Sequence, residues 1–408
     1  MGISKLDFED LTSKQKYLIE TVRQLGIKNF APRAHLYDAQ ATFPHENYQD
    51  LSENGLLALC IPQEYGGMGA DFATYCLISA EIARYCGATA LTYNMHICST
   101  LWLVLSKELP MTEMQREECE LYQIKHFSRI VREKAIYSQP ISEAGAGVSM
   151  GKSYQTRAKK VDGGWIINGT KIFASLSGSA NYYGVVCTEQ KDMASVEDTL
   201  YLAIPAHAKG VEVTGNWDPL GMRGTVSRTL IFNDVFVNDD AQLLPNNIYF
   251  KLTQYYPYIF FTLASTYMGI AQAAYDFTVK YLRGEVEGIP PIKRRKEKIK
   301  QFVVAEMFIK LEQTKALFHK VIHETQFNPS KAKRLRIYAA NYTIMENSNE
   351  LSRLAIRVCG GQSLLKTFSL ERLYRDSSCG AIMRPWSSDR CLDKLGFETL
   401  YEPGEIDD

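Results

Sequence analysis

Hydrophobic positions along the chain follow two different periods. In the first third of the sequence, apolar residues recur every three to four positions, as in Lys14–Ile27 and Phe72–Cys86. The same spacing returns near the end, where Val303–His323 and Ala332–Val358 are the longest such patterns. Because this spacing puts apolar side chains on one face of a helix, both regions are predicted to be helical.

The region between the helical patterns is typical of β structure. Its apolar runs are short, rich in Val, Ile, Tyr and Thr, and separated by turn residues. Asp162-Gly163-Gly164 joins a run ending at Val161 to the next one, and Asn168-Gly169 is predicted to be a second tight turn. Further strands are expected over Tyr183–Thr188, Leu200–Pro205 and Arg228–Val237.

These patterns predict an α+β multidomain chain. We expect an N-terminal α-helical domain over residues 1–136, a central β-barrel or sandwich domain over 137–245, and a C-terminal four-helix-bundle domain over 246–408. One stretch, Leu252–Tyr275, carries no charge for 24 residues, which is long enough to cross a bilayer. It contains a proline, two glutamines and five tyrosines, so a buried helix is favoured over a membrane span.

Charge and composition exclude several classes of function. The 408 residues hold 46 Lys+Arg and 46 Asp+Glu, so the net charge is zero and no nucleic-acid or anionic-membrane partner is indicated. None of the nine cysteines forms a Cys-x-x-Cys pair, which favours a reducing, cytoplasmic location over a disulfide or zinc framework. The first ten residues are charged and lack an apolar segment, so neither a signal peptide nor a transit peptide is expected.

Several short segments resemble, in the same order, the signatures of the acyl-CoA dehydrogenase family. They are Ile61–Gly69, Ile141–Gly147, Ile167–Ser175, Leu220–Thr225, Phe232–Val237, Cys359–Gly361 and Glu371–Asp376. The resemblance covers nearly the whole chain and implies the family's fold, with FAD bound between the β domain and the C-terminal helices in a homo-oligomer, a dimer or a tetramer. It also implies an acyl-CoA-like substrate, removal of an α-proton with transfer of the β-hydride to flavin N5, and an external electron acceptor.

The resemblance places most cofactor contacts in two segments. Phe173 is expected to lie against the flavin ring, and Ser175 is expected near N5, where the hydride arrives. Val148 is expected beside the substrate. The pyrimidine edge of the flavin is expected to meet Gln139, Ile141 and Ser142.

Two positions depart from the family's cofactor pattern. Arg357 stands where the family usually has Gln before Gly360 and Gly361, and its guanidinium is expected to hold a pyrophosphate oxygen. The family's loop that reaches a neighbouring subunit's FAD has no clear match, and the basic run Lys293–Lys296 is a candidate replacement. Both features are also typical of solvated helix ends.

The largest departure concerns the catalytic base. The family's Glu lies nine residues after the Arg of its Arg-Asp pair, and counting from Arg375 gives Arg384. Some members carry the Glu ten residues before a Gly that corresponds to Gly269, and that position is Ile259, followed by Phe260. Arginine stays protonated and cannot serve as a base, so the catalytic residue is unknown.

Three interpretations of this departure stay open. A dehydrogenase with another base has Asp389, Tyr256 and Tyr258 as candidates, and Arg384 then faces a polar group of the substrate, pairs with Asp389 or turns to solvent. A reduced-flavin-dependent monooxygenase on the same fold needs no α-proton base. Its usual histidines are not evident, because His96 lies in an apolar run typical of a core helix. A non-catalytic scaffold is disfavoured, since it has no need of the flavin-facing residues.

Two short patterns suggest other chemistry but lack its context. His319 and His323 share a helix face, but Lys320 replaces the Glu of a zinc-protease motif, so no metal site is predicted. Gly147–Gly151 matches Gly-x-Ser-x-Gly, but no strand–turn–helix unit surrounds it, so no hydrolase nucleophile is expected.

Overall fold

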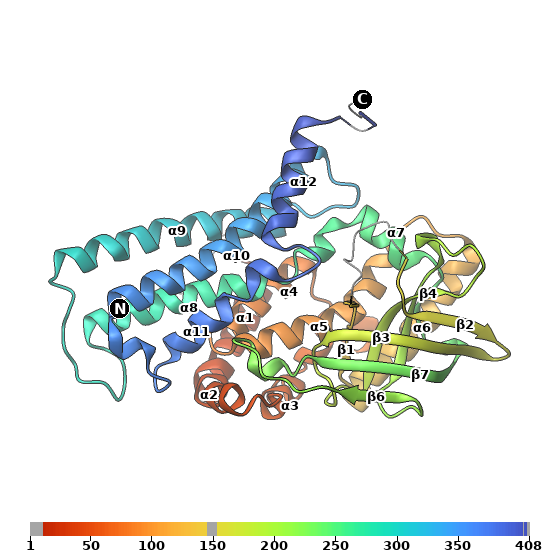
Figure 1. The fold of residues 1–408 in the computed structure, drawn as a ribbon, viewed down its shortest axis with the longest axis horizontal. Coiled ribbons are helices and arrows are strands. Elements are labelled where there is room, and N and C mark those ends of the chain that lie inside the picture. Colours follow the sequence, from red (N-terminus) through yellow and green to blue (C-terminus); the bar gives the residue numbers. More distant parts are fainter. Residues whose placement is uncertain (1–10, 145–152, 403, 406–408) are drawn as a thin grey trace.

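The computed structural model describes residues 11–144, 153–402 and 404–405, and its elements form a helical part beside a sheet (Figure 1). Val148 and the segment 147–151 lie outside the described residues. The helices before the sheet are α1 (Ser13–Leu25), α2 (Ala31–Gln40), α3 (His45–Glu53), α4 (Phe72–Ala83), α5 (Gly87–Leu105) and α6 (Glu113–Glu133).

Local hydrogen bonds explain where two of these helices begin. The side-chain oxygens of Thr12 and Thr112 accept the backbone N–H of Gln15 and Gln115, and both glutamine side chains bond back to the threonine N–H. This capping box satisfies backbone donors that the first turn of a helix leaves free. It sets the first residues of α1 and α6.

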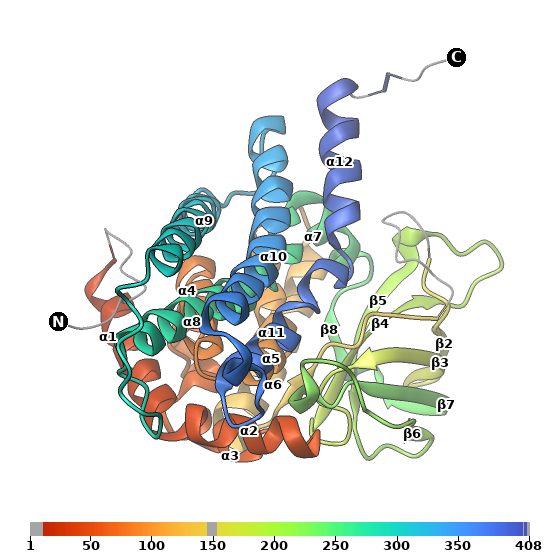
Figure 2. The ribbon, with the colours of Figure 1, turned by 60° about the vertical axis from the view of Figure 1, so that its left-hand side comes forward.

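The central strands form one eight-stranded sheet. They are β1 (Tyr137–Ser138), β2 (Arg157–Val161), β3 (Gly164–Ala174), β4 (Tyr182–Glu189), β5 (Thr199–Pro205), β6 (Val211–Thr214), β7 (Arg228–Asn238) and β8 (Gln242–Leu244). The order is β6-β7-β3-β2-β4-β5-β8, and β1 pairs with β4. Only two residue pairs join β2 to β4, so the half with β3 and the half with β5 meet at a narrow contact (Figure 2).

The C-terminal helices pack mainly on one another. They are α7 (Ile248–Tyr255), α8 (Ala264–Arg283), α9 (Lys298–His323), α10 (Lys331–Cys359), α11 (Ser369–Ser377) and α12 (Ser388–Leu400). Helices α8, α9, α10 and α11 form the predicted bundle, while α4 packs against α8 and α5 against β1. Figure 2 shows α12 projecting beside α10 away from the body.

Two local predictions are wrong. Asn168-Gly169 is not a turn, because β3 continues through both residues with a bulge between Ile167 and Gly169. A Cβ at Gly169, whose φ is +150°, would lie 2.6 Å from Thr156 Cα, so the glycine permits close approach of the backbone just before β2. Leu252–Tyr275 is not one helix, since the chain breaks at Pro257 between α7 and α8.

No helix among the described residues is long and apolar enough to cross a membrane.

Candidate active site

The segment after β1 is fastened to the end of β3. Ser138 Oγ donates to the Ser175 carbonyl oxygen at 2.5 Å, and the Ile172 N–H donates to the Ser142 carbonyl oxygen at 2.9 Å. These bonds join chain positions that are 37 and 30 residues apart. The structure therefore brings the predicted residues 139–142 together with the predicted residues 173 and 175.

A buried ion pair fixes the same segment from inside. Lys171 Nζ lies 2.7 Å from Glu143 Oε1, with side chains 0% and 2% exposed, and it also donates to the Ile141 carbonyl oxygen at 3.3 Å. The Glu143 carboxylate accepts the N–H groups of Gln155 and Thr156 at 2.7 and 2.9 Å. Burial raises the pKa of Glu143, but Lys171 and these hydrogen bonds outweigh it and hold the pKa below its usual value.

We call the C-terminal end of β3, with the segments hydrogen-bonded to it, the β3 edge. Several non-glycine residues there adopt left-handed backbone conformations. Phe173, Leu176, Met222 and Val226 have φ values of 51°, 66°, 54° and 46°. Such values are strained for bulky residues, and strain of this kind gathers at functional sites. The concentration at the β3 edge marks it as the candidate site.

Phe173 lies at the surface of this edge. Its side chain is 68% exposed, and its ring meets the edge of Trp217 with centroids 6.4 Å apart. A large exposed aromatic ring held in a strained conformation fits contact with a planar ligand.

One buried amide at this edge lacks a partner. Gln139 is 7% exposed, and its Nε2 has no hydrogen-bond acceptor in the described part of the chain. A buried N–H without an acceptor costs free energy, which a ligand carbonyl relieves. The carbonyls on the pyrimidine edge of a flavin match this donor, so the residues present fit the group.

The predicted pyrophosphate residues lie elsewhere in the chain. Arg357, Gly360 and Gly361 are exposed at the C-terminal end of α10. Helix α10 runs from α12 to the end of the bundle opposite the sheet (Figure 1). A single chain therefore does not bring these residues to Ser175.

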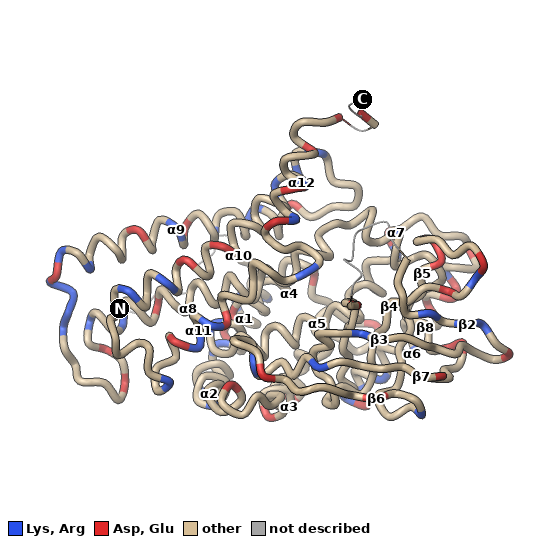
Figure 3. The backbone as a smooth tube through the Cα atoms, viewed as in Figure 1, with Lys and Arg blue, Asp and Glu red and all other residues tan. Residues whose placement is uncertain are grey.

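The basic run before α9 lies at this same far end (Figure 3). The Arg294 guanidinium lies over the Tyr281 ring at 4.5 Å, and the Tyr281 hydroxyl donates to Gln362 Oε1 at 3.1 Å. Gln362 directly follows Gly361, so the two departures from the family's cofactor pattern are neighbours in space.

Aromatic residues line the region where the sequence predicts the catalytic base. The rings of Phe260 and Trp386 have centroids 5.3 Å apart, so the segments containing Ile259 and Arg384 lie side by side. Trp386 is 3% exposed and also meets Tyr338 at 4.9 Å. Both positions predicted for the family's Glu thus lie beside one aromatic wall, formed by Phe260 and Trp386.

Arg384 is exposed rather than buried. Across residues 11–144, 153–402 and 404–405 it has no hydrogen bond or ion pair, so it does not pair with Asp389. Asp389 is itself exposed, in the first turn of α12. The guanidinium is free to meet a ligand or solvent.

Neither tyrosine candidate suits proton abstraction. Burial raises the pKa of Tyr256, and it raises that of Tyr258 to about 12. A base working near neutral pH needs the opposite shift. The Tyr258 hydroxyl donates instead to the Glu324 carbonyl oxygen at 3.3 Å.

His96 is a core histidine, as its apolar surroundings predict. Its Nδ1 accepts the Tyr137 N–H at 3.1 Å, so Nε2 carries the proton and donates to the Leu57 carbonyl oxygen at 2.9 Å. Sequence reasoning missed His126, whose Nδ1 bonds the Tyr137 hydroxyl at 2.9 Å. Burial lowers the pKa of His96 to about 4 and that of His126 to about 3.

The 220–225 segment docks on α11. The Met222 N–H donates to Asp376 Oδ1 at 2.6 Å, and Arg375 forms an ion pair with Asp38 at 2.6 Å. Burial raises the pKa of Asp376 to about 6. Two of the family-like segments are therefore structural partners, a pairing that their separation in sequence concealed.

A surface pocket of about 300 Å³ lies between α6 and the sheet. Its lining residues are Lys125, Arg129, Ala203, Pro205, Phe236, Val237, Asn238, Asp240 and Ala241. None of the predicted site residues belongs to this set.

Sequence comparison decides the family. Sequence models of the acyl-CoA dehydrogenase N-terminal, middle and C-terminal domains match residues 12–109, 138–235 and 261–384. The chain belongs to the acyl-CoA dehydrogenase family. It is therefore a flavoprotein oxidoreductase of acyl-CoA dehydrogenase type, with FAD as the family's cofactor.

Curated members of the family align with this chain over most of their length. The chain is 26% identical to the probable acyl-CoA dehydrogenase YngJ of Bacillus subtilis, covering 91% of this chain and 94% of the relative. It is 26% identical to the human mitochondrial short-chain specific acyl-CoA dehydrogenase, covering 90% and 86%.

Solved structures share the fold. Butyryl-CoA dehydrogenase from Megasphaera elsdenii has a TM-score of 0.79 at 22% identity, covering 97% of this chain and 100% of that one. KijD3 in complex with dTDP has a TM-score of 0.81 at 20% identity, covering 96% and 98%. FMN-bound TdsC from Paenibacillus has 0.79 at 21%, covering 93% and 96%.

Proposed function

We propose that this acyl-CoA dehydrogenase family member catalyses α,β-dehydrogenation of an acyl-CoA or related acyl thioester and passes the electrons to an external acceptor. The observation that carries the proposal is the β3 edge, where hydrogen bonds from Ser138 to Ser175 and from Ile172 to Ser142 hold residues 139–142 beside the end of β3. An electron transferring flavoprotein among the structures of similar fold fits the idea of a flavoprotein acceptor.

The chain's own residues suit the flavin half of this reaction. FAD supplies the group that accepts a hydride and later releases the electrons. Gln139 Nε2 and the backbone N–H groups of Ile141 and Ser142 would hold the pyrimidine edge, since the carbonyl groups of both residues accept hydrogen bonds within the chain. Phe173 would cover the ring, and the Ser175 hydroxyl would meet N5.

The pyrophosphate half is proposed to involve a second subunit. Arg357, Gly360 and Gly361 stand exposed at the far end of the bundle, beside Arg294. Exposed groups of this kind can serve a flavin bound by a neighbouring copy. Arg357 and the run Lys293–Lys296 would then supply the positive charge for its phosphates.

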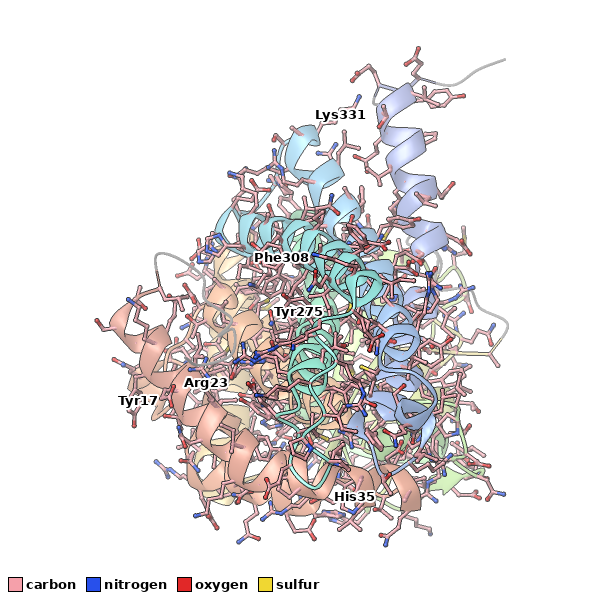
Figure 4. All side chains as sticks on the ribbon, turned by 90° about the vertical axis from the view of Figure 1, so that its left-hand side faces the viewer. Tyr17, Arg23, His35, Tyr275, Phe308 and Lys331 are labelled. Atoms are coloured by element: carbon pink, nitrogen blue, oxygen red, sulfur yellow. The ribbon has the colours of Figure 1, made fainter. Side chains whose placement is uncertain are left out.

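Exposed apolar side chains on α9 support a homo-oligomer, dimer or tetramer. Phe302 is 74% exposed, Ile299 67%, Ile309 59% and Phe308 49%. Phe308, labelled near Tyr275 of α8 in Figure 4, is half exposed beside that ring, and their ring centroids are 6.2 Å apart. Apolar patches of this kind mark contact surfaces. A monomer in light scattering at micromolar concentration contradicts this part.

Substrate choice is proposed to depend on Arg384 and Val148. Because Arg384 is exposed and unpaired within the described chain, its guanidinium is available for a carboxylate or carbonyl oxygen of a polar acyl group. The proton acceptor then comes from outside the two usual positions. A cytoplasmic location is also proposed, since all nine cysteines are free of disulfides.

One observation favours a second candidate function. The aromatic wall of Phe260 and Trp386, in place of a carboxylate, suits a planar substrate and a reduced-flavin-dependent monooxygenase reaction. One protein of similar fold, TdsC from Paenibacillus, has been solved in complex with FMN and indole.

Formation of an oxygenated product separates the two functions. A dehydrogenase purifies with tight FAD and forms no oxygenated product when a separate reductase supplies reduced flavin. A monooxygenase loses flavin on purification and oxygenates its substrate only with that supply. An oxygenated product that requires both the reductase and this protein would overturn the dehydrogenase proposal.

A further inference from the structure

Three hydroxyl groups form a chain that leads from Ser175 into the protein. Ser175 Oγ lies 2.8 Å from Ser227 Oγ, and Ser227 Oγ lies 2.8 Å from Thr225 Oγ1. Thr225 Oγ1 lies 2.9 Å from the Met222 carbonyl oxygen. All three hydroxyl residues are buried, with exposures of 7%, 6% and 1%.

The inner end of this chain sets its direction. A carbonyl oxygen only accepts, and each hydroxyl carries one proton. Thr225 therefore donates to Met222, which obliges Ser227 to donate to Thr225 and Ser175 to donate to Ser227. All three contacts can be hydrogen bonds only if the protons are donated in this direction. Ser175 keeps lone pairs for a ligand but has no free proton.

Backbone hydrogen bonds hold the hydroxyls in place. The Leu176 N–H donates to the Thr225 carbonyl oxygen at 3.0 Å, and the Ser177 N–H donates to the Val226 carbonyl oxygen at 3.1 Å. The two segments that carry the hydroxyls are thereby tied side by side. Their relative position does not depend on the side chains themselves.

We propose that Ser227 is a positioning residue that makes the Ser175 hydroxyl a hydrogen-bond acceptor toward flavin N5, so that the site favours reduced flavin. The inference rests on the proposed FAD site. N5 carries a hydrogen only in reduced flavin, whereas N5 of oxidised flavin accepts. An acceptor-only Ser175 therefore stabilises the reduced form and offers nothing to the oxidised form.

The midpoint potential of bound FAD tests this role. In Ser227→Ala, the Ser175 proton loses its acceptor and turns to oxidised N5. One hydrogen bond shifts the ratio of reduced to oxidised flavin roughly tenfold, which lowers a two-electron potential by about 30 mV. Ser227→Thr keeps a hydroxyl and keeps the wild-type potential.

Ser177→Ala is the matched control. Ser177 is a buried serine at the same edge, and its hydroxyl donates to the Ala174 carbonyl oxygen outside the chain of hydroxyls. Its removal is expected to leave the potential unchanged. If Ser227→Ala does not retain FAD, Ser227→Cys tests a smaller shift of the same sign, because a thiol is a weak acceptor.

A double-mutant cycle shows whether Ser227 acts through Ser175. In the Ser175→Ala background, Ser227→Ala is expected to cause no further shift. An equal shift in both backgrounds, or no shift in Ser227→Ala with FAD bound, overturns the role of Ser227 and leaves the FAD site intact. A wild-type protein that binds no FAD overturns the proposed function itself, and this inference with it.

Discussion

The β3 edge and the aromatic wall around Phe260 and Trp386 differ in chemistry. At the β3 edge, hydroxyls and backbone groups are joined by hydrogen bonds, and the buried Gln139 Nε2 has no acceptor among the described residues. At the wall, Ile259 and Arg384 stand at the two positions where counting along the sequence predicts the family's Glu. The proposed flavin side keeps the residues that the resemblance predicts, and the proposed proton-accepting side does not.

Under the proposed function, this difference means that the two halves of the reaction depend on separate parts of the chain. Ser175 and Phe173 are positioned by contacts within the sheet and with the 222–227 segment. Phe260 and Trp386 belong to the helical part and pack on α10 through Tyr338. A change at the wall therefore alters substrate chemistry without disturbing the flavin edge.

Restoring the carboxylate gives the largest expected effect. Arg384→Glu is expected to raise kcat/KM for simple straight-chain acyl-CoAs by roughly a hundredfold or more, since a positioned general base contributes about that factor. Arg390→Glu makes the same charge change on α12 and is the control. Equal activity in wild type and Arg384→Glu would place residue 384 outside the active site.

Breaking the buried ion pair tests the rigidity of the flavin edge. Lys171→Met leaves Glu143 buried without its partner, which costs about 3–5 kcal/mol of the free energy of unfolding. Lys160→Met breaks an ion pair with Asp239 whose side chains are 47% and 52% exposed, and costs under about 1 kcal/mol. Urea unfolding measures both. Similar losses in the two variants would show that the buried pair does not fasten the edge.

Acid is expected to lower the free energy of unfolding, because two buried histidines form hydrogen bonds with Tyr137. The pKa values of His96 and His126 in the folded chain, about 4 and 3, lie below the usual 6.5. The unfolded chain therefore binds more protons in acid, and stability present above pH 6.5 is lost as pH falls toward 4. The expected loss is about 3 kcal/mol for His96.

Urea midpoints at pH 7 and pH 4.5 measure this loss. His96→Gln is expected to reduce the change in the urea midpoint between the two pH values. His35→Gln, which replaces an exposed histidine, is expected to leave that change as it is in the wild type. A wild-type midpoint that does not move between these pH values argues against neutral buried histidines.

The smallest effect concerns the flavin ring. Phe173→Ala is expected to weaken FAD binding about three- to tenfold, since an aromatic stacking contact contributes about 0.5–1.5 kcal/mol. Its high exposure means that folding stability changes little. Tyr17→Ala, similarly exposed on α1 and outside the proposed subunit contact, is the control for FAD affinity in titrations. An unchanged dissociation constant for Phe173→Ala removes Phe173 from the cofactor site.

The sequence predicted the fold better than the site. Helical and β patterns located α1, α9 and α10 to within a few residues, because each buries a long apolar face. The prediction at Gly169 was wrong because a glycine in a β-bulge and a glycine in a turn cannot be told apart in the sequence without the strands that pair beside them. Pro257 was visible, but its effect on the uncharged stretch depended on the helices packed around it.

The sequence indicated candidate site residues only where they lie in segments that resemble the family's signatures. Gln139, Ser142 and Ser175 came from resemblance, and hydrogen bonds bring their segments together. The hydroxyl chain through Ser227 and Thr225 was hidden, since it joins residues about fifty positions apart. The exposure of Arg384 depends on how its loop packs, which no spacing in the sequence reveals.

The most direct test of the central claim is anaerobic reduction of the bound flavin by substrate. Purified protein with its FAD is mixed without oxygen with a panel of acyl-CoAs that includes polar and acidic acyl groups, and the flavin absorbance is followed. We predict that at least one acyl-CoA bleaches the flavin, with polar acyl groups acting faster than straight chains. A flavin that stays oxidised with every acyl-CoA, in a protein that turns over only with reduced flavin and oxygen, would contradict the claim.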